Sequence, residues 1–354
     1  MTSADERIRA LFAGEDHVFL IAEAGCNYEG DFARAEEMVR AAAGAGADAI
    51  KFQTFVPERL VTRDAPKFWD IEGCPGATQF EEFAQTPQLV EAQYRALKRI
   101  ADEEGIVLFS TPSDESSADM LDALGLPLEK ISSMDITHLP LIRHIARMAK
   151  PVILSTGAST MDEIREAVTA IEGEGNDRIA LLHCITSYPT RPEDVNLNMM
   201  KAIMEEFPGY PVGYSDHTTM PESTGVITAA VALGARVIEK HFTFDRTRPG
   251  YDHAISADYH DLAEMVRQIS FTRGLLGSGV KAPVGAEERA RAWARRSVVA
   301  RVPIPRGTRI TGEMLVVKRP GTGIPPKHLE GLVGRVAAVD IAGDQVITWE
   351  MIGR

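Results

Sequence analysis

The sequence predicts a TIM (β/α)8 barrel followed by a small β-rich module. The first observation is a rhythm of short, continuous apolar runs between residues 17 and 241, each followed by a segment long enough for a helix. Continuous apolar runs are typical of parallel strands covered by helices. The second is that nearly every run ends on a residue that can carry chemistry, and the carboxyl ends of TIM-barrel strands form the active-site face. The third is that the rhythm stops after Leu276, where short β-like pieces and turns begin.

The apolar runs give the predicted strands, and their ends bring candidate chemical groups to one rim. In chain order they are HVFLIAE, ending at Glu23; DAIKFQT, with Lys51 and Gln53; IVLFST, with Ser110 and Thr111; LEKISS, with Lys130 and Ser133; PVILST, with Ser155 and Thr156; IALLHC, with His183; PVGYSDH, with Ser215 and His217; and RVIEKH, with Glu239 and His241. One barrel mouth is therefore expected to hold lysines, hydroxyl groups, a carboxylate and two histidines, which indicates an enzyme.

The segments between the strands carry helix signals, with one exception. Asp31 is placed to cap the helix that starts FARAEEMVRAAAGAG, and residues 158–163 put hydroxyls and then acids at the start of IREAVTAIEG. Residues 56–87, after the second strand, instead form a long connection rich in Pro, Gly and aromatic residues. Long βα loops in barrels are often lids or oligomer contacts, and a plain surface elaboration is the equally weighted alternative.

The sequence divides the chain into a catalytic barrel over residues 1–279, a linker over 280–293 and the small module over 294–354. Within the module, residues 310–315 resemble residues 347–352, and each copy follows a turn that contains glycine. This repeat predicts a compact unit with a local pseudo-dyad. A unit of about sixty residues buries little core, so we expect it to dock on a barrel.

Composition narrows the class of protein. The net charge of −13 argues against nonspecific binding to nucleic acid or to anionic membranes. No apolar stretch is long enough for a transmembrane helix, and the N-terminus lacks the pattern of a signal peptide. Cys26, Cys74 and Cys184 are widely separated, which suits a reducing compartment, so a cytoplasmic protein is expected.

Lysines and serines at the strand ends predict an anion site. Lys51 and Gln53 lie two residues apart on one strand and therefore point to the same face. A lysine on an apolar strand is costly to bury unless it meets an anion, and Lys130 is a second such lysine. Hydroxyls on the same rim could help to hold phosphate or carboxylate oxygens; they belong to Ser133, Ser155 and Ser215. The alternatives are lysines that extend to solvent and serines that cap helices.

Two histidines predict a metal site. His217 and His241 end the seventh and eighth strands, which are neighbours in a barrel closed in sequence order. Two imidazoles completed by oxygen ligands suit a borderline divalent ion such as Mn²⁺, with a pair of structural histidines as the alternative. Glu23 is a candidate general base or ligand, with a salt bridge to a lysine as the alternative. Cysteine catalysis is rejected, because the adjacent His183 and Cys184 face opposite sides of their strand.

Segments along the whole chain together resemble the sialic acid synthases, which make N-acetylneuraminate, legionaminate and pseudaminate. The match runs in order from about residue 18 to 350, through IAEAGCNYEGD, GADAIKFQTF, FSTPSDE, EKISSMDITHLPLI, KPVILSTGAST, LLHCITSYPT, PEDVNL, VGYSDHT, ALGARVIEKHFT and RPGYDH. The tail RRSVVARVPIPRGTRITGEMLVVKRPGTGI resembles the C-terminal antifreeze-like (SAF) domain of that family.

The resemblance implies a reaction and a role for each matching position. Phosphoenolpyruvate would condense with an N-acetylated hexosamine aldehyde, releasing phosphate and using a divalent metal, Mn²⁺ by expectation, with Mg²⁺ or Co²⁺ as alternatives. By position, the phosphoenolpyruvate pocket falls to Lys51, Thr111, Lys130, Ser133, Ser155 and Ser215; the metal to His217 and His241; catalysis to Glu23 with Lys51; and the sugar to Gln53, Asp135, Tyr188, Asp252 and Arg319. A domain-swapped homodimer is also implied, in which the tail of each chain delivers Arg319 to its partner.

The chain departs from the family pattern at three positions. Tyr28 stands where many members have His, Ser113 where many bacterial members have Phe, and Asp135 where many have Glu. The phosphate and metal positions are intact, so the reaction class is retained while the identity of the sugar stays open. Whether the sugar is phosphorylated also stays open, because several loop cations could meet a second phosphate or simply face solvent: Arg59, Arg63, Lys67 and Arg191.

Three other functions compete with this reading. The nearest is a phosphoenolpyruvate-dependent synthase that makes a 3-deoxy sugar acid from a phosphorylated aldose, and the antifreeze-like tail argues against it. A metal-dependent amidohydrolase would require His-x-His at the end of the first strand, where this chain has Glu23-Ala24-Gly25. A non-catalytic ligand-binding or ice-binding protein would not require lysines and histidines at a barrel mouth.

Overall fold

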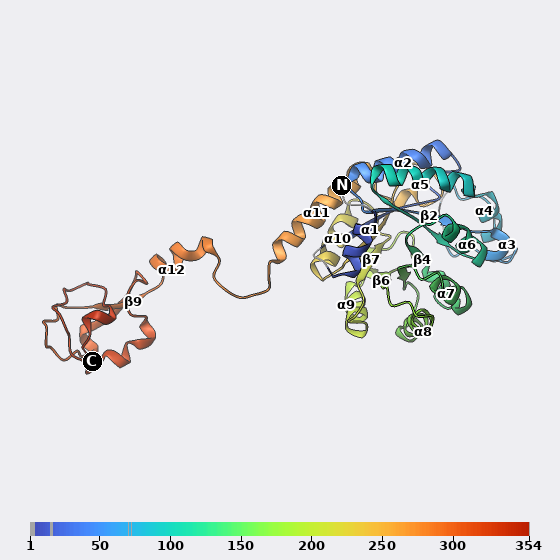
Figure 1. Cartoon of the computed structure of the whole chain (residues 1–354). Coiled ribbons are helices and arrows are strands. Elements are labelled where there is room, and N and C mark those ends of the chain that lie inside the picture. The colour runs from blue at the N-terminus through green and yellow to red at the C-terminus, as the bar shows by residue number, and fades with distance from the viewer. Residues whose placement is uncertain (1–3, 15–16, 70, 72, 354) are drawn as a thin grey trace. The chain divides into compact units, whose positions relative to one another are not determined.

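The computed structural model describes residues 4–14, 17–69, 71 and 73–353, and its larger part is a barrel of eight parallel strands surrounded by helices (Figure 1). The strands are β1 (Phe19–Gly25), β2 (Ala49–Thr54), β3 (Val107–Pro112), β4 (Glu129–Ile131), β5 (Val152–Ser155), β6 (Ile179–Cys184), β7 (Val212–Asp216) and β8 (Val237–His241). Each strand lies within one of the predicted apolar runs or overlaps it. The predicted TIM barrel is confirmed.

The strands pair in the order β3-β2-β1-β8-β7-β6-β5-β4, so β1 and β8 join the beginning of the barrel to its end. In this register Glu23 lies beside Lys51 on one side and beside His241 on the other. Strands β3 and β4 stand at the two ends of the hydrogen-bonded order and contact each other, which makes the barrel nearly closed. Strand pairing alone therefore brings a carboxylate, a lysine and a histidine into adjacent positions.

The helices that cover the barrel begin where the local signals place them. They are α2 (Phe32–Ala45), α5 (Glu91–Glu104), α6 (Glu115–Ala123), α7 (Leu139–Ala146), α8 (Met161–Glu172), α9 (Leu197–Glu206), α10 (Glu222–Ala232) and α11 (Tyr259–Leu276). The Asp31 side chain accepts a hydrogen bond from the Arg34 amide and caps α2. Thr160 and Glu163 form a capping box at α8, which satisfies backbone N–H groups of its first turn.

A further helix, α1 (Ala4–Phe12), precedes the eight predicted units. Its Ile8 and Leu11 are buried in one cluster with Phe19, Val107 and Val237, which begin β1, β3 and β8. Helix α1 therefore closes the amino-terminal end of the barrel core, which leaves the carboxyl ends of the strands as the open face.

The segment 56–87 folds into two short helices, α3 (Pro57–Leu60) and α4 (Gln79–Gln85). Aromatic rings hold it against the end of β2: the ring centroids of Phe55 and Phe83 are 5.1 Å apart, and those of Trp69 and Phe83 are 5.8 Å apart. The Lys67 Nζ lies 2.7 Å from Glu82 Oε2 within the same segment. The connection is thus held to the barrel by ring contacts and tied together by an ion pair, and its role as a lid, an oligomer contact or a surface elaboration stays open.

The first compact unit ends at Gly277 and the second begins at Ser278. The predicted linker over 280–293 contains most of a short helix, α12 (Glu288–Ala294). In the module that follows, β9 (Ser297–Ala300) and β10 (Leu315–Lys318) pair antiparallel, and this unit has its own buried cluster, which includes Val298 and Ile347.

The two copies of the sequence repeat in the second unit adopt the same local conformation. Each forms a short 3-10 turn, Gly312–Met314 in one copy and Trp349–Met351 in the other, and each turn follows a threonine with extended backbone. The predicted docking of this unit on a barrel stays a prediction.

The structure bears on two features of the sequence, its lack of a transmembrane stretch and its three separate cysteines. In the part of the chain that the structure describes, no helix is both long enough and apolar enough to cross a membrane. All three cysteines are free thiols, and Cys26 and Cys184 are buried.

Candidate active site

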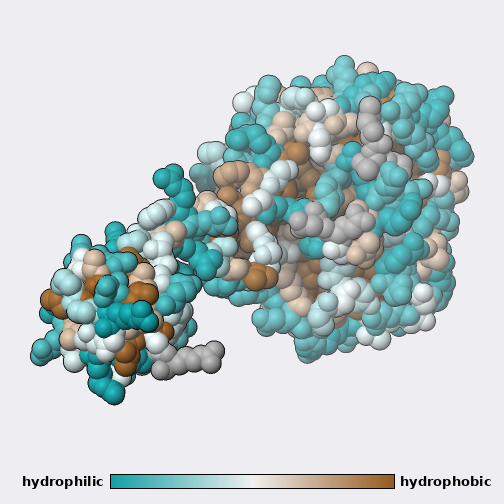
Figure 2. Space-filling view, turned by 60° about the vertical axis from the view of Figure 1, so that its left-hand side comes forward, coloured by the Kyte–Doolittle hydropathy of each residue, from teal (hydrophilic) through white to brown (hydrophobic). Residues whose placement is uncertain are grey.

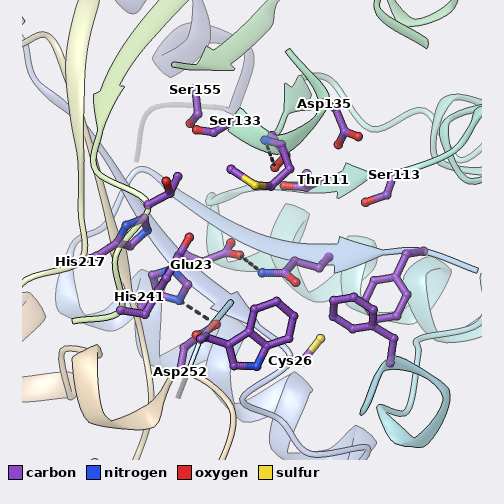
Figure 3. A pocket seen from close by; sticks show the side chains of 18 of the residues that line it. Glu23, Cys26, Thr111, Ser113, Ser133, Asp135, Ser155, His217, His241 and Asp252 are labelled. Carbon is purple, nitrogen blue, oxygen red and sulfur yellow. Dashed lines mark hydrogen bonds and ion pairs between the residues drawn. The ribbon is translucent and has the colours of Figure 1, made fainter. Parts of the chain in front are cut away.

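A cavity of about 590 Å³ opens at the carboxyl ends of the strands. Figure 3 shows the labelled side chains Glu23, His217, His241 and Asp252 on one side of this space, with Ser133, Ser155 and Asp135 on another. Every barrel residue that the sequence assigned to the site lines the cavity: Glu23, Lys51, Gln53, Thr111, Lys130, Ser133, Asp135, Ser155, Tyr188, Ser215, His217, His241 and Asp252. These residues thus share one site.

Lys51 stands at the centre of a buried ionic network. Its Nζ lies 2.7 Å from Glu23 Oε2 and donates a hydrogen bond of 3.0 Å to Thr111 Oγ1. The Glu239 Oε1 is 3.8 Å away on the other side. Gln53 Nε2 donates to the second Glu23 oxygen at 2.9 Å. The salt bridge that the sequence left open for Glu23 therefore exists, and it lies inside the cavity rather than on the surface.

Burial and charge divide the two carboxylates of this network. Burial raises the pKa of Glu23, and the neighbouring Lys51 opposes this only in part. Burial also disfavours the charged form of Glu239, but the ammonium groups of Lys51 and Lys130 hold the pKa of this carboxyl below its usual range. The pKa values of these two carboxyls are thus shifted in opposite directions, a division typical of acid–base sites.

The second lysine lies among hydroxyl groups. Lys130 is 3% exposed, and its Nζ donates to Ser155 Oγ at 2.8 Å and to the Ile131 carbonyl at 3.1 Å. Ser133 Oγ accepts a hydrogen bond of 2.8 Å from the Gly157 amide, and Ser215 Oγ donates to Glu239 Oε1 at 3.1 Å. Burial lowers the pKa of Lys130, and the charge of Glu239 opposes this only in part. An anion bound here would supply the missing charge.

The two histidines lie side by side, with ring centroids 5.3 Å apart. His217 Nδ1 is 2.7 Å from the Ile185 carbonyl oxygen, which can only accept, so Nδ1 carries the proton and Nε2 keeps a free lone pair. Burial, followed by the charge of His241, lowers the pKa of His217 to about 4 and keeps that ring neutral. A neutral imidazole with an oriented Nδ1–H is the form in which histidine binds a metal.

A carboxylate lies beside His241. Its Nδ1 is 3.3 Å from Asp252 Oδ2, a close approach rather than an aligned hydrogen bond. Among the described residues, no group of three or more His, Cys, Asp or Glu side chains is arranged as a complete metal site. A metal at this place would therefore take two protein nitrogens and complete its coordination with water or substrate oxygens, which a catalytic site with open positions allows.

Asp252 is held in place by a residue that the sequence analysis treated only as part of a motif. The Asn27 Oδ1 accepts a hydrogen bond of 3.1 Å from the Asp252 amide, and Asn27 Nδ2 donates to the Phe242 carbonyl and to Ser256 Oγ. Next to it, Tyr28 Oη donates to the Pro87 carbonyl at 2.6 Å, at the end of the segment 56–87. The departure at Tyr28 thus serves the packing of this segment.

Tyr188 and Asp135 line the same cavity from two other loops. The Tyr188 ring lies over His217 with centroids 4.2 Å apart, and burial raises the pKa of its hydroxyl well above the usual value. Burial raises the pKa of Asp135 to about 6. Both groups are therefore positioned as neutral or weakly ionised hydrogen-bonding partners at moderately acidic pH.

Strand alternation at the end of β6 is confirmed, and the structure adds which side chain faces the cavity. Cys184 lines it, and its Sγ is 3.8 Å from His217 Nδ1, whereas His183 Nε2 approaches the Val195 carbonyl oxygen outside the barrel. Burial raises the pKa of the Cys184 thiol to about 11. A thiol of this kind is a poor nucleophile at neutral pH, so the rejection of cysteine catalysis stands.

Arg319 is the one predicted site residue outside the barrel. It is exposed in the second unit, directly after β10. Its delivery to the site of a partner chain stays a prediction.

Comparison with known proteins agrees with this geometry. Residues 38–281 match the NeuB family and residues 295–353 match the SAF domain. The chain is 39% identical to the N,N'-diacetyllegionaminic acid synthase of Legionella pneumophila, over 94% of each chain. It is 34% identical to the human N-acetylneuraminate-9-phosphate synthase, over 96% of this chain and 94% of that one.

A solved structure is similar as well. The N-acetylneuraminic acid synthetase of Leptospira borgpetersenii is 34% identical, with a TM-score of 0.69, over 77% of this chain and 90% of the other. A family match over most of the barrel, a second match to the SAF domain and relatives similar over nearly their full length agree with one another. The chain therefore belongs to the NeuB family, the sialic acid synthases, and is an enzyme of the N-acetylneuraminate synthase type.

Proposed function

We propose that the protein is a metal-dependent nonulosonic acid synthase, which condenses phosphoenolpyruvate with an N-acylated hexosamine to give a nine-carbon 2-keto-3-deoxy acid and phosphate. The observation that carries this proposal is the convergence of two buried lysines and two neighbouring histidines on one cavity around Glu23. The names of the relatives, which are synthases of legionaminic acid and of N-acetylneuraminate 9-phosphate, support the same chemistry.

The phosphoenolpyruvate end of the site would be formed by the lysines and hydroxyls. Lys51 and Lys130 are 4% and 3% exposed, so an anion that contacts them would meet little competition from water. The hydroxyls of Thr111 and Ser155 already accept hydrogen bonds from these lysines and could turn toward phosphate oxygens. Ser133 and Ser215 complete the same wall.

The metal would be held by His217 and His241. The donor set fits a borderline ion, because one ring is neutral and oriented and the other lies against a carboxylate, and we propose Mn²⁺, with Mg²⁺ or Co²⁺ as alternatives. When bound, such an ion polarises the carbonyl oxygen of the sugar aldehyde and makes its carbon electrophilic.

The remaining steps belong to residues of the chain. Carbon 3 of phosphoenolpyruvate forms a bond to the aldehyde carbon, and positive charge develops at carbon 2. Glu23 lies where a carboxylate can stabilise that charge or remove a proton from the water that attacks carbon 2. The resulting tetrahedral intermediate breaks its bond to the phosphate oxygen, and Lys51 and Lys130 hold the departing phosphate.

The sugar would meet the other residues of the cavity, namely Gln53, Asp135, Tyr188 and Asp252, with Arg319 supplied by a partner chain. A homodimer is supported by large apolar side chains that solvent reaches at the end of α11, where Phe271, Leu275 and Leu276 are 59%, 67% and 51% exposed. Apolar patches interrupt an otherwise hydrophilic surface in the face shown by Figure 2. Contiguous exposed apolar residues of this kind are typical of association surfaces.

A direct assay tests the proposal. The protein, Mn²⁺, phosphoenolpyruvate and N-acetylmannosamine are incubated together, phosphate release is followed, and the product is identified by mass spectrometry. We expect release of phosphate only when both substrates are present. Release with phosphorylated aldoses that lack an acylamino group, and with no N-acylhexosamine, would favour a 3-deoxy sugar acid synthase instead. Calorimetry that detects no binding of phosphoenolpyruvate would contradict both.

A further inference from the structure

Away from the lysines and histidines, much of the cavity wall is apolar. The segment 56–87 contributes a mostly apolar surface there, formed by Leu60, Val61, Phe68, Trp69, Ile71 and Phe83. Phe83 is the centre of this surface, because it contacts Phe55 and Trp69. We call these side chains the apolar wall.

The cations of this segment are paired with groups of the segment or with residues next to it. Lys67 Nζ lies 2.7 Å from Glu82 Oε2 and donates to the Pro75 carbonyl. Arg59 NH1 pairs with Asp114 at 3.1 Å, and the Arg63 guanidinium lies over the Phe80 ring, 4.8 Å from its centroid. None of these three residues lines the cavity.

The fourth loop cation is also engaged. Arg191 pairs with Asp194 at 2.7 Å and does not line the cavity. In the described part of the chain, the positive charges of the cavity wall therefore come from Lys51 and Lys130, with His217 and His241 as the other basic groups. The proposed function uses all four for phosphoenolpyruvate and the metal.

Acidic groups also line the cavity. Glu82 and Asp135 line the cavity, and Glu82 is paired with Lys67 at 2.7 Å. A phosphate monoester carries nearly two negative charges at neutral pH, and it would meet carboxylates and apolar rings here. Burying such an anion without a cationic partner is strongly unfavourable.

We propose, on the basis of the proposed function, that the acceptor sugar is unphosphorylated and that the end remote from its aldehyde lies against the apolar wall. Phosphoenolpyruvate adds three carbons to the aldehyde, so carbon 6 of the hexosamine becomes carbon 9 of the product. The protein is therefore a synthase of free nonulosonic acids. Arg319 of a partner chain is the single further cation that the resemblance places near the sugar, and the described barrel residues place no cation on the apolar wall itself.

Three acceptors that differ only at carbon 6 test this proposal: N-acetylmannosamine, its 6-deoxy analogue and its 6-phosphate. With phosphoenolpyruvate and Mn²⁺ held constant, kcat/KM is measured from the nine-carbon product by mass spectrometry. We expect the 6-deoxy sugar to be used at least as well as the parent sugar, because a methyl group suits an apolar wall. We expect the 6-phosphate to be at least about tenfold poorer, as for a buried charge without a partner.

The outcomes separate the two proposals. A higher kcat/KM for the 6-phosphate than for the free sugar overturns the inference and leaves the synthase function intact. Absence of product from all three acceptors, with phosphoenolpyruvate and metal present, overturns the proposed function and the inference with it.

A pair of variants on one helix tests the contact itself. Phe83 lines the cavity and Phe80, on the same helix α4, does not. Phe83→Ala should raise the KM for the 6-deoxy sugar by about tenfold while the KM for phosphoenolpyruvate stays within about twofold. Phe80→Ala, matched in size and helix, should change neither. Circular dichroism checks that both variants are folded, and equal KM values for the 6-deoxy sugar in folded Phe83→Ala and the parent protein would overturn the assigned contact.

Discussion

At the residue scale, the site shows which assignments local sequence can support. The position of Lys51 and Lys130 in the cavity wall could be predicted because a lysine inside an apolar strand has few structural reasons to be there. Their partners could not, since the contact of Lys51 with Glu239 joins strands far apart in sequence. The role of Asn27 was missed for the same reason: its hydrogen bonds cross to residues of the chain beyond β8.

The first residue-scale prediction concerns phosphoenolpyruvate. Lys51→Ala should weaken its binding about tenfold or more, because a charge-assisted contact with phosphate contributes roughly 1.5–3 kcal/mol. The variant also leaves Glu23 without its ion-pair partner, so some loss of thermal stability is expected along with retained fold. Calorimetry measures the dissociation constant, with the surface variant Lys98→Ala as control. An unchanged dissociation constant in a folded protein would remove Lys51 from the pocket.

The second residue-scale prediction concerns the metal. Turnover should stop after chelation and return with Mn²⁺, because the described residues offer only His217 and His241 as neighbouring ligands. His217→Ala removes one of these two nitrogens and should greatly weaken Mn²⁺ binding, measured by calorimetry or by paramagnetic resonance. Substitution of His144, which is paired with Asp119 on the surface, is the matched control. Full turnover of chelator-treated enzyme would refute the assignment.

The third residue-scale prediction concerns pH. Burial raises the folded-state pKa of Asp135 to about 6, above its usual value, so the fold favours the protonated carboxyl. The stabilising contribution of that protonation is complete at low pH, below the pKa of the unfolded chain, and is lost as pH rises through about 6. Asp135→Asn removes this dependence and should make the protein roughly 1–3 kcal/mol more stable than the parent near neutral pH, but not near pH 4. Urea unfolding at both pH values measures it, and an equal difference at the two would contradict the prediction.

At the element scale, strands were predictable and connections were not. A barrel strand is a short apolar run whose end faces the mouth, so its position follows from local composition and the rule for parallel sheets. The segment 56–87 has no such rule, because its conformation depends on ring contacts such as that of Phe83 with Phe55 at the end of β2. Helix α1 was missed because its apolar face, with Ile8 and Leu11, has meaning only once the open end of the barrel core is known.

The element-scale prediction concerns the junction of β7 and β8. Lys240 Nζ lies 2.7 Å from Asp216 Oδ2 and donates to the Thr218 carbonyl, and both ionic side chains are 0% exposed. Asp216 also accepts a hydrogen bond from Ser223. Each member of the pair precedes a proposed metal ligand, so this ion pair fixes the two strand ends that carry His217 and His241.

Lys240→Met should destabilise the protein by about 3–5 kcal/mol, because it leaves a buried carboxylate without its counter-charge. The double variant Lys240→Met/Asp216→Asn should recover part of that loss. Lys98→Met breaks the exposed pair with Asp102 and should change stability by less than about 0.5 kcal/mol. Urea unfolding measures all three, and a cost for Lys240→Met as small as that of Lys98→Met would show that the buried pair contributes little.

At the scale of the whole molecule, the chain consists of a barrel unit and a SAF unit, joined by residues that include α12. The barrel contains the cavity and every predicted site residue but one, whereas Arg319 lies exposed in the second unit. The presence of a second unit could be predicted because the βα rhythm stops after Leu276. The arrangement of the units in an assembly could not, because it depends on contacts between surfaces rather than on local sequence.

The last prediction tests whether Arg319 acts in the active site of a partner chain. Two inactive proteins, Lys51→Ala and Arg319→Ala, are mixed in equal amounts, dissociated and reassembled, and the mixed dimers are verified by mass. If the arginine crosses the dimer, each mixed dimer has one site with an intact barrel and an intact tail. Random pairing makes about half of the dimers mixed, so about a quarter of the parent activity should return.

Two controls show whether recovered activity comes from subunit exchange. The same proteins mixed without dissociation should stay inactive, because no subunits exchange. Each variant taken alone through dissociation and reassembly should also stay inactive, which excludes recovery by refolding. If Arg319 serves its own chain, every site in a mixed dimer keeps one defect, and the mixture is as inactive as its parents. That result would refute the crossed arrangement and leave the chemistry of the barrel cavity untouched, because Lys51, Glu23 and the two histidines all belong to one chain.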